Sequence, residues 1–185
     1  MWLLYEDTNE EKYLSALETL LRTFQERLDQ NIGLNTHDIG FLYSLSTLVG
    51  YKITGNEKAL EFLVRAADCL MERYSEKTQI IQAWGVFGFA LSYAHTGILA
   101  CGLLELSKHL PVLAPRKKEY EETAVQIVKS LFENYTTEKD LSNGIIKHGV
   151  YAIPFHVGVD ECCIWGDYFY VEALMRLRNV WNMYW

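Results

Sequence analysis

The segment THDIGFLYSLS places a histidine and an aspartate, His37 and Asp38, at the start of a nearly all-apolar stretch. A carboxylate in the first turn of a helix is favoured by the helix dipole, so Asp38 can be a simple N-terminal charge, the more common role for an aspartate there. If the apolar stretch buries the pair, a desolvated carboxyl group can instead perform acid and base chemistry. Asp38 is therefore the candidate catalytic residue, and His37 beside it is a candidate binding residue.

The stretch IIQAWG combines an amide, Gln82, with an indole, Trp84, next to a glycine. This combination suits a sugar, which forms hydrogen bonds with the amide and stacks on the ring. A tryptophan in a helical core is as often a packing residue, so both interpretations of Trp84 stand at this point.

The C-terminal stretch DECCIWGDYFYVEAL gathers Trp165, Asp167 and Tyr168 around a helix that we expect to start near Gly166. Asp167 suits the first turn of that helix, where a dipole-complementing charge is its more common role. Tyr168 and Tyr170 cannot both face one side of the helix, so at least one of them is structural. These residues are candidates for substrate binding.

A metal or cofactor is not expected. His148, His156, Cys162 and Cys163 lack paired-ligand spacing, and adjacent cysteines rarely both bind one ion. The sequence contains no Gly-x-Ser-x-Gly elbow, P-loop or Gly-x-Gly-x-x-Gly, so esterase, nucleotide and dinucleotide chemistry have no support.

The 185 residues, 50% of them hydrophobic and 14% aromatic, suffice for one packed domain. A net charge of −7 argues against nucleic acid and anionic membranes as partners, because both would repel the chain. The four cysteines show no disulfide framework and the start of the chain does not resemble a signal peptide, which predicts a cytoplasmic protein. The apolar region from Ile80 to Leu106 is interrupted by polar residues, which suits a buried helix better than a membrane span.

Apolar residues at three- and four-residue spacing predict a mostly α-helical fold. One amphipathic helix carries inward residues Leu14, Leu17, Leu20, Leu21, Phe24 and Leu28. A second, capped by Asn35 or Thr36, carries Ile39, Leu42, Tyr43, Ser46 and Val49. A third follows a left-handed turn at Gly55 and an N-cap at Asn56, and it carries Leu60, Leu63, Ala67 and Leu70.

The first and third helices are related by an internal repeat. Tyr5, Thr8, Glu11, Lys12, Leu14, Glu26 and Arg27 recur at a constant spacing as Tyr51, Thr54, Glu57, Lys58, Leu60, Glu72 and Arg73. A repeat of this length is one helical hairpin, which must stack on neighbours to bury its apolar face, as in α-solenoids and α/α toroids. The ending Tyr-x-x-Thr-Gly returns at Tyr93, Thr96 and Gly97, but no amphipathic helix follows it, so the register breaks there.

Two more helices are expected toward the C-terminus. One spans roughly Lys117 to Tyr135, with Tyr120, Ala124, Ile127, Val128 and Leu131 inward, and a loop region follows to Asp160. The last starts near Gly166, and we expect its core face to be Tyr168, Val171, Leu174, Met175 and Leu177.

Three blocks of the sequence together resemble the unsaturated glucuronyl hydrolases, glycoside hydrolase family 88. They are WLLYEDTNEEKY with THDIGFLYSLS, then AADCLMERYSEKTQIIQAWG, and finally IWGDYFYVEALMRL. The resemblance implies an all-α fold of α/α hairpin repeats. Residues 1–185 would form a single truncated domain, a partial or remodelled (α/α)6 toroid.

The chain is much shorter than members of that family, and the resemblance implies internal deletions. Family members carry two Gln-Ala-Trp-Gly stretches, whereas this chain has one whose left flank resembles the early copy and whose right flank resembles the late copy. A deletion would therefore join at Gly85 and Val86, with a second gap near Thr96 to Ile98. The family's Asp-x-x-x-Asn-Leu-Pro segment, whose aspartate is its principal proton donor, does not occur in this sequence.

The resemblance assigns roles residue by residue. Asp38 matches the aspartate of the family's His-Asp-x-Gly-Phe motif, which implies a catalytic role. The remaining matches imply substrate binding by His37, Gln82, Trp84, Tyr151, Trp165, Asp167 and Tyr168. A family histidine that follows the tyrosine is Ala152 here, and an arginine two positions before the amide is Ile80.

The implied reaction is hydration of the C4–C5 double bond of an unsaturated uronic acid on an oligosaccharide left by a polysaccharide lyase. The alternative is a helical-repeat remnant that binds a sugar or a protein without catalysis. An incomplete toroid would also expose apolar inner faces, which predicts self-association.

Overall fold

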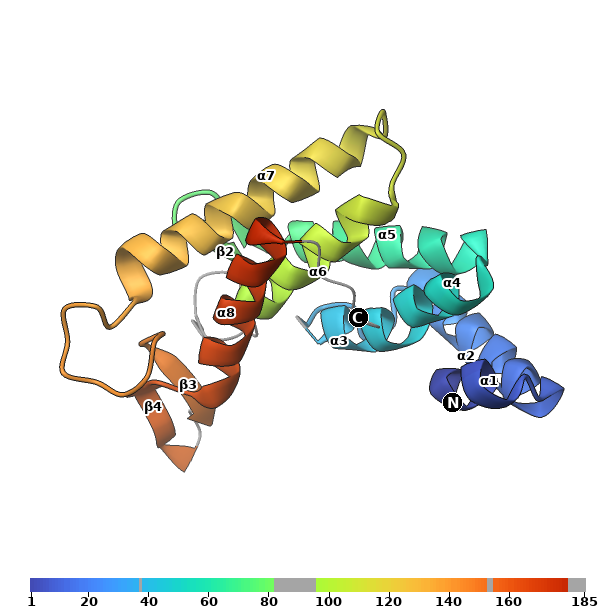
Figure 1. Cartoon of the computed structure of the whole chain (residues 1–185), viewed down its shortest axis with the longest axis horizontal. Helices are drawn as coiled ribbons and strands as arrows, with labels where there is room; N and C mark the ends of the chain where they lie inside the picture. Colours follow the sequence, from blue (N-terminus) through green and yellow to red (C-terminus); the bar gives the residue numbers. More distant parts are fainter. Residues whose placement is uncertain (37, 82–95, 153–154, 180–185) are drawn as a thin grey trace. The chain divides into compact units, whose positions relative to one another are not determined.

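The computed structural model describes residues 1–36, 38–81, 96–152 and 155–179, and helices dominate it (Figure 1). Its contacts divide the chain into two compact units, one comprising Met1–Glu72 and the other beginning at Arg73. The predicted all-α class of helical hairpins is confirmed. The expectation of one domain over residues 1–185 stays a prediction.

The first unit consists of helical hairpins. Its elements are α1 (Trp2–Thr8), α2 (Glu11–Asp29), α3 (Ile39–Tyr43), a π-helical segment (Ser44–Leu48), α4 (Val49–Thr54) and α5 (Glu57–Met71). The inward face of α2 is as predicted at Leu17, Leu21, Phe24 and Leu28. Leu20 is exposed, which contradicts the prediction, because it lies beside the stripe that these four residues form.

The internal repeat is present in the hydrogen bonds. At the end of α1 the backbone N–H of Asn9, in the left-handed conformation, donates to the carbonyl of Tyr5 at 2.8 Å. At the end of α4 Gly55, also left-handed, donates to the carbonyl of Tyr51 at 2.7 Å. Thr8 and Thr54 repeat as well, since each donates its hydroxyl to the carbonyl four residues earlier. The two helix-turn-helix connections are therefore copies of one structure.

Gly55 is the turn residue whose replacement we expect to matter most. Its φ of 69° lies in the left-handed region, where a Cβ is strained, although no atom lies within 4 Å of the position a Cβ would take. We expect Gly55→Ala to lower the free energy of unfolding by about 1 kcal/mol, measured by urea unfolding. Asn9→Gly, at the equivalent turn, should not destabilise the chain; a Gly55→Ala variant as stable as wild type would contradict the role of the turn.

The predicted second helix is continuous but locally widened. Ile39 and Tyr43 are fully buried, and the Tyr43 hydroxyl donates to the carbonyl of Phe24 at 3.1 Å. In the π-helical segment the carbonyl of Ser46 accepts the indole N–H of Trp2 at 2.8 Å. The predicted cap by Asn35 or Thr36 is wrong, because the N-cap position of α3 is Asp38, which has no side-chain cap hydrogen bond. The Thr36 hydroxyl accepts the N–H of Asp38 at 3.2 Å in the turn before the helix.

The third helix, α5, follows its sequence signals closely. The Asn56 side chain accepts the N–H of Lys58 at 3.0 Å, as an N-cap does. The predicted inward residues are all buried: Leu60, Leu63, Ala67 and Leu70.

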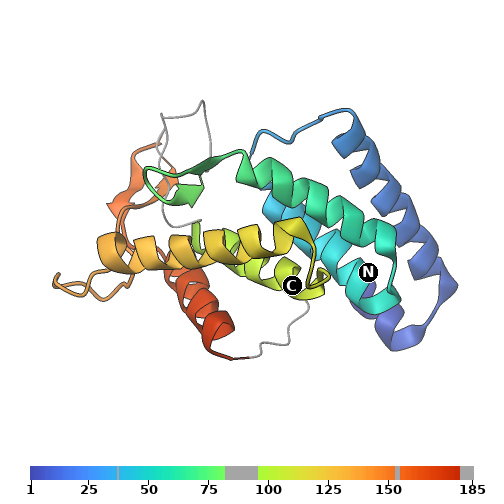
Figure 2. The same cartoon turned by 90° about the horizontal axis from the view of Figure 1, so that it is seen from above.

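The second unit is built around one buried helix. Its elements are β1 (Tyr74–Ser75), β2 (Ile80–Ile81), α6 (Thr96–His109), α7 (Pro115–Ser130), a π-helical segment (Leu131–Tyr135), β3 (Gly149–Ala152), β4 (Val157–Glu161) and α8 (Ile164–Arg178). Helices α7 and α8 both pack on α6, as Figure 2 shows. The predicted inward residues of α7 are buried, with Tyr120, Ala124 and Ile127 fully so.

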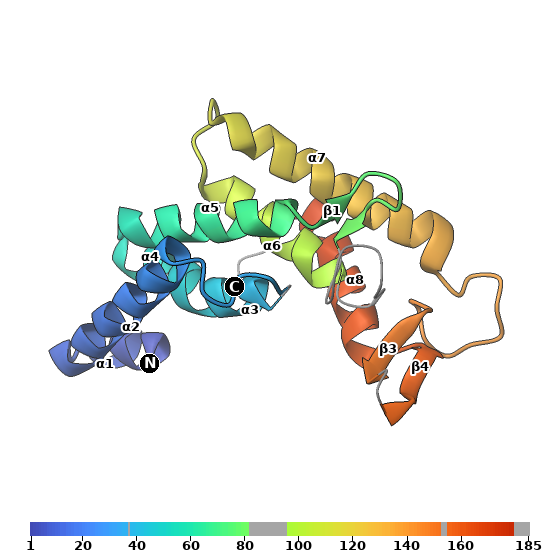
Figure 3. The ribbon, with the colours of Figure 1, turned by 180° about the vertical axis from the view of Figure 1, so that it is seen from behind.

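The region expected to be a loop up to Asp160 contains a β-hairpin, which sequence reasoning missed. Strands β3 and β4 pair antiparallel, with an irregularity between Gly149 and Val150. Figure 3 shows this hairpin beside the start of α8. His148, His156 and Asp160 have positive φ values, so three non-glycine residues adopt left-handed conformations that composition alone does not reveal.

The third Thr-Gly ending does not form a turn. Thr96 and Gly97 lie within α6 and are buried. A Cβ on Gly97 would come within 3.0 Å of the backbone nitrogen of Tyr170, so glycine permits close contact between α6 and α8. The break of register predicted at this point is confirmed, because the helix α6 begins at Thr96, where the other two repeats turn.

The predicted core face of α8 is wrong. Tyr168, Val171, Leu174 and Leu177 are all exposed, and the buried residues of this helix include Tyr170, Ala173, Glu172 and Arg176. The apolar periodicity is genuine, but the opposite face packs on α6, where Arg176 bonds to Glu172 of its own helix and to Glu105 of α6. The exposed residues, together with Ile164, form an apolar stripe on α8.

Candidate substrate-binding site

Asp167 fixes the loop that precedes the hairpin. It lies in the first turn of α8, and its Oδ1 accepts the backbone N–H groups of Ile145 and Ile146 at 3.0 and 2.8 Å. Gly144 fits tightly beside it, since a Cβ there would meet Cys162 at 2.3 Å. Asp167 therefore does more than complement the helix dipole, because it joins the loop to the start of the helix.

Tyr151 and Trp165 form an aromatic pair at this place. Tyr151 comes from β3 and Trp165 from the first turn of α8, and their ring centroids are 5.6 Å apart at an interplanar angle of 40°. Tyr151 is exposed, whereas the indole nitrogen of Trp165 is buried and has no hydrogen-bond partner among the described residues. Burial raises the pKa of the adjacent Cys163 thiol, so that sulfur stays neutral and is only a weak acceptor.

Tyr168 extends the same surface along α8. Its side chain is 46% exposed and packs edge-on against Phe169 at a centroid distance of 5.0 Å. Partial burial, and after it the neighbouring Glu172 carboxylate, raises the pKa of the phenol. The hydroxyl therefore keeps its proton near neutral pH and can donate a hydrogen bond.

Asp38 belongs to the first unit and is exposed. Its Oδ2 accepts the Thr36 hydroxyl at 3.1 Å, and its side chain does not cap α3. The structure therefore does not support the desolvated pocket expected around this carboxyl group. His37, Gln82 and Trp84, and the junction at Gly85 and Val86, lie outside the described residues.

Sequence reasoning missed a buried charged cluster between α6 and α8. Arg176, 5% exposed, donates to Glu105 at 2.5 Å and to Glu172 at 2.8 Å. Lys108 also contacts Glu105, at 3.0 Å. Burial, and after it Glu172, raises the pKa of the Cys101 thiol. The available signal was the pair of opposite charges four residues apart in an apolar helix.

The described residues offer no evident metal centre or membrane span. They contain no group of three or more histidines, cysteines or acidic residues arranged to bind a metal ion. The four cysteines are free thiols. Within the same ranges, every helix is too short or too polar to cross a membrane.

Comparison with known proteins connects these observations. No family model matches the chain. The chain is 24% identical to the "Unsaturated chondroitin disaccharide hydrolase" of Streptococcus pneumoniae, over all of this chain and 81% of the relative. It is 23% identical to the "Unsaturated glucuronyl hydrolase" of Bacillus sp. strain GL1, over all of this chain and 85% of the relative.

Two solved structures are also similar. A variant of the unsaturated glucuronyl hydrolase of Streptococcus agalactiae matches all of this chain and 78% of its own, at 25% identity and a TM-score of 0.52. An unsaturated glucuronyl hydrolase specific for heparin matches 74% of this chain and 38% of its own, at 23% identity and a TM-score of 0.62. The second likeness concerns the fold.

The chain is thus related to glycoside hydrolases with an α/α-hairpin fold. It is a shortened relative of the unsaturated glucuronyl hydrolases. The alignment with the Streptococcus pneumoniae protein is 321 positions long although this chain has 185 residues, so the relative contains long internal segments that this chain lacks.

Proposed function

We propose that this chain acts on oligosaccharides that end in an unsaturated uronic acid, with a turnover far below that of its longer relatives. The observation that carries the proposal is the pair of Tyr151 and Trp165, a ring surface with an exposed tyrosine in a relative of enzymes for such sugars. The free cysteines support work in a reducing compartment, the cytoplasm.

The proposed reaction is hydration followed by ring opening. A carboxyl group donates its proton to C4 of the double bond and becomes a carboxylate. The oxygen of a water molecule bonds to C5, and one proton of that water passes to the carboxylate. The resulting hemiketal opens and releases the next sugar. This route differs from hydrolysis by two carboxylates that flank a glycosidic bond.

Asp38 is the proposed acid and base. The residue matches the family's catalytic motif, and Thr36 holds its carboxyl group by a hydrogen bond at 3.1 Å. The sequence lacks the family's second aspartate segment and Asp38 is exposed to water, so we expect slow turnover.

Substrate binding is proposed for His37, Gln82, Trp84, Tyr151, Trp165, Asp167 and Tyr168. Among the described members, Tyr168 supplies a hydroxyl group, and Tyr151 and Trp165 supply ring faces. The hydroxyl can meet a polar group of the sugar despite the chain's net charge of −7. Asp167 acts indirectly, by holding the loop at Ile145 and Ile146.

A test of this surface removes one ring. We expect Tyr151→Ala to weaken binding of an unsaturated chondroitin disaccharide about two- to tenfold, because an aromatic contact contributes about 0.5–1.5 kcal/mol. Titration calorimetry would measure it. Tyr151→Phe should bind nearly as wild type, and Phe132→Ala, which removes another exposed ring of the same unit, serves as the control. Equal affinity in Tyr151→Ala and wild type would remove the pair from the site.

The second candidate function is sugar binding without turnover. The exposure of Asp38 favours it, because water competes with a substrate for contact with this carboxyl group. Calorimetric binding of the disaccharide together with constant double-bond absorbance over many hours would support this function and exclude the first.

We also propose that the chain self-associates through the apolar stripe on α8. The stripe comprises Ile164, Tyr168, Val171, Leu174 and Leu177. Such contiguous exposed apolar surface is uncommon on a monomer, and this chain lacks internal segments that its longer relatives contain. The proposed occupant is a second copy of the same chain.

Light scattering after size exclusion tests self-association. Wild type is expected to show a dimer whose fraction rises with concentration, and Leu174→Glu should shift it to monomer. Val125→Glu, at a single exposed apolar position of α7, is the control and should leave the dimer intact. A wild-type chain that remains monomeric throughout the concentration series refutes the interface.

A further inference from the structure

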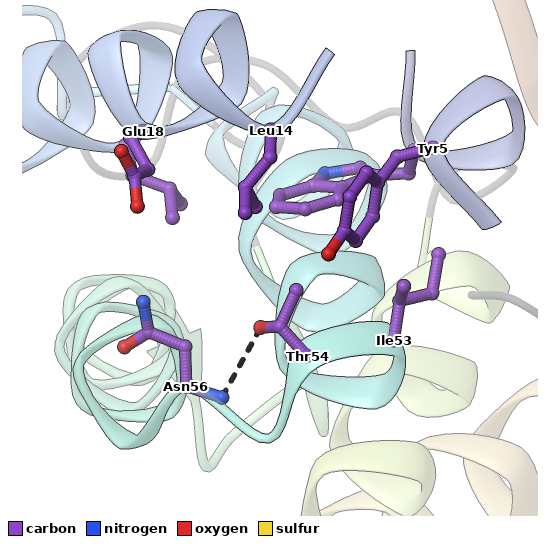
Figure 4. Close-up of a pocket in the computed structure, with 8 residues that line it drawn as sticks. Tyr5, Leu14, Glu18, Ile53, Thr54 and Asn56 are labelled. Atoms are coloured by element: carbon purple, nitrogen blue, oxygen red, sulfur yellow. Dashed lines mark hydrogen bonds between the residues drawn. The ribbon is translucent and has the colours of Figure 1, made fainter. Parts of the chain in front are cut away.

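The first unit contains a cavity of about 390 Å³ between its two repeated helix-turn-helix connections. Figure 4 shows the residues around it, from α1, α2, α4 and the start of α5. Six of them are Tyr5, Leu14, Glu18, Ile53, Thr54 and Asn56. A volume near the lower end of ordinary ligand pockets suits a small molecule.

Some polar groups of this cavity are already used by the fold. The Thr54 hydroxyl donates to the carbonyl of Gly50 at 2.7 Å and accepts the N–H of Asn56 at 3.2 Å. The side-chain oxygen Oδ1 of Asn56 accepts the N–H of Lys58 at 3.0 Å. These bonds fix the rim of the cavity, and they fix the amide orientation of Asn56, so its NH₂ group turns away from the cap.

Three polar groups are left for a ligand. Throughout the described ranges, no hydrogen-bond or ionic partner is found for the Glu18 carboxylate, the Tyr5 hydroxyl or the Asn56 NH₂ group. In Figure 4, Glu18 and Asn56 face one another across the opening, and Tyr5 directs its hydroxyl into it. The cavity therefore presents one strong acceptor, one double donor and one group that can do either.

The walls of the cavity are apolar and aromatic. Trp2 and Tyr5 contribute rings, and Leu14 and Ile53 contribute aliphatic side chains. Trp2 is held in place, because its N–H is bonded to Ser46 and its ring lies against Gly50, where a Cβ would come within 2.5 Å. A rigid ring of this kind does not have to be ordered when a ligand binds, which favours affinity.

The polar pair at the rim is not a consequence of the repeat. Tyr5 has its counterpart in Tyr51, and Thr54 has its counterpart in Thr8, as the repeated turn requires. The position equivalent to Glu18 is Val64, a different residue type. Glu18 thus gives this cavity a carboxylate that the repeated scaffold does not need.

We propose that this cavity binds a neutral pyranose sugar, at a site separate from Asp38 and from the α8 surface. A pyranose has an apolar C–H face for an aromatic ring and hydroxyl groups that donate to a carboxylate and accept from an amide. The negative charge of Glu18 selects against a uronate, which distinguishes this ligand from the charged end of the proposed substrate. The inference does not rest on the proposed reaction.

The test is titration of the full chain with N-acetylglucosamine, followed by ¹⁵N chemical shifts, with glucuronate as the anionic comparison. Shifts are expected at Tyr5, Ile53 and Asn56, and glucuronate should bind at least about tenfold more weakly than the neutral sugar. Glu18→Gln should weaken binding of the neutral sugar about tenfold, since it replaces a charge-assisted hydrogen bond by a neutral one. It should also reduce the difference in affinity between the neutral sugar and glucuronate.

Glu26→Gln, an exposed carboxylate on the same helix, is the matched control and should bind as wild type. Because Glu18 is exposed, its substitution should leave the melting temperature unchanged, so weaker binding will not report unfolding. No shift at Tyr5, Ile53 and Asn56 with sugar at 100-fold excess, or equal affinity of Glu18→Gln and wild type, overturns the proposal. Both outcomes are read in the first unit and are independent of turnover.

Discussion

Replacing Asp38 with asparagine is expected to lower the rate at which this chain destroys the double-bond absorbance of an unsaturated uronyl disaccharide by at least about 100-fold. Asparagine keeps the shape of the side chain and can still accept the Thr36 hydroxyl, which now lies 3.1 Å away. It cannot donate a proton to C4 or take one from water. The loss would therefore come from the chemistry and not from a change of fold.

The measurement requires controls because the expected wild-type rate is itself small. Asp7→Asn removes another exposed carboxylate of the first unit and should retain wild-type turnover. Asp38→Glu keeps a carboxyl group and should retain part of the wild-type turnover. Undiminished turnover in Asp38→Asn would show that another residue is the acid and would withdraw the assignment of Asp38.

Local signals in the sequence sufficed wherever a helix end or an amphipathic face was set by neighbouring residues. Gly55 and Asn56 are an example, because a left-handed turn and an N-cap need no distant contact. The spacing of Tyr5 and Thr8 against Tyr51 and Thr54 likewise predicted an internal repeat, and the hydrogen bonds show that it forms two equal turns.

Long-range packing could not be predicted in the same way. Apolar periodicity in α8 identified the stripe at Val171 and Leu174 but placed it inside, because the pattern does not reveal which neighbour exists to cover it. The hairpin β3–β4 was missed because Val157 and Val159 are exposed on a short strand with little alternation between buried and exposed positions.

The candidate site was predicted only in part. Trp165 and Asp167 were selected from their motif, and the structure adds what each does: one pairs with Tyr151 and the other binds the backbone of the preceding loop. The burial expected for Asp38 failed because an apolar helix can bury one face while its first turn stays in water. Exposure of a helix end depends on the segments around it, which spacing does not encode.

Arg176→Ala is expected to destabilise the second unit by about 3–5 kcal/mol, the largest stability effect that we predict for the chain. The guanidinium group lies between the carboxylates of Glu105 and Glu172, and all three side chains are almost completely buried. One oxygen of Glu172 has no hydrogen-bond partner among the described residues even with the arginine present. Removing Arg176 would leave two buried carboxylates facing each other.

Lys108 and His109 can reduce the loss of stability only at Glu105, the carboxylate that they contact. They approach Glu105 at 3.0 and 3.4 Å, and both are more exposed than the arginine, so solvent screens their attraction. Glu172 is paired with Arg176 at 2.7 Å, so this carboxylate depends on the arginine. Replacing only the arginine therefore costs more stability than replacing all three charged residues. The triple variant Glu105→Leu, Glu172→Leu, Arg176→Met should recover much of the stability that Arg176→Ala loses.

Urea unfolding followed by circular dichroism measures both variants. Arg116→Ala is the matched control, because this arginine contacts Glu119 at 2.7 Å on the exposed surface of α7 and should contribute less than about 1 kcal/mol. A loss below about 1 kcal/mol for Arg176→Ala would mean that water reaches Glu105 and Glu172 in solution. We expect Arg176→Ala to be far less stable than both the triple variant and Arg116→Ala. The reason is desolvation, because a charge inside the protein needs its partner far more than a charge in water does.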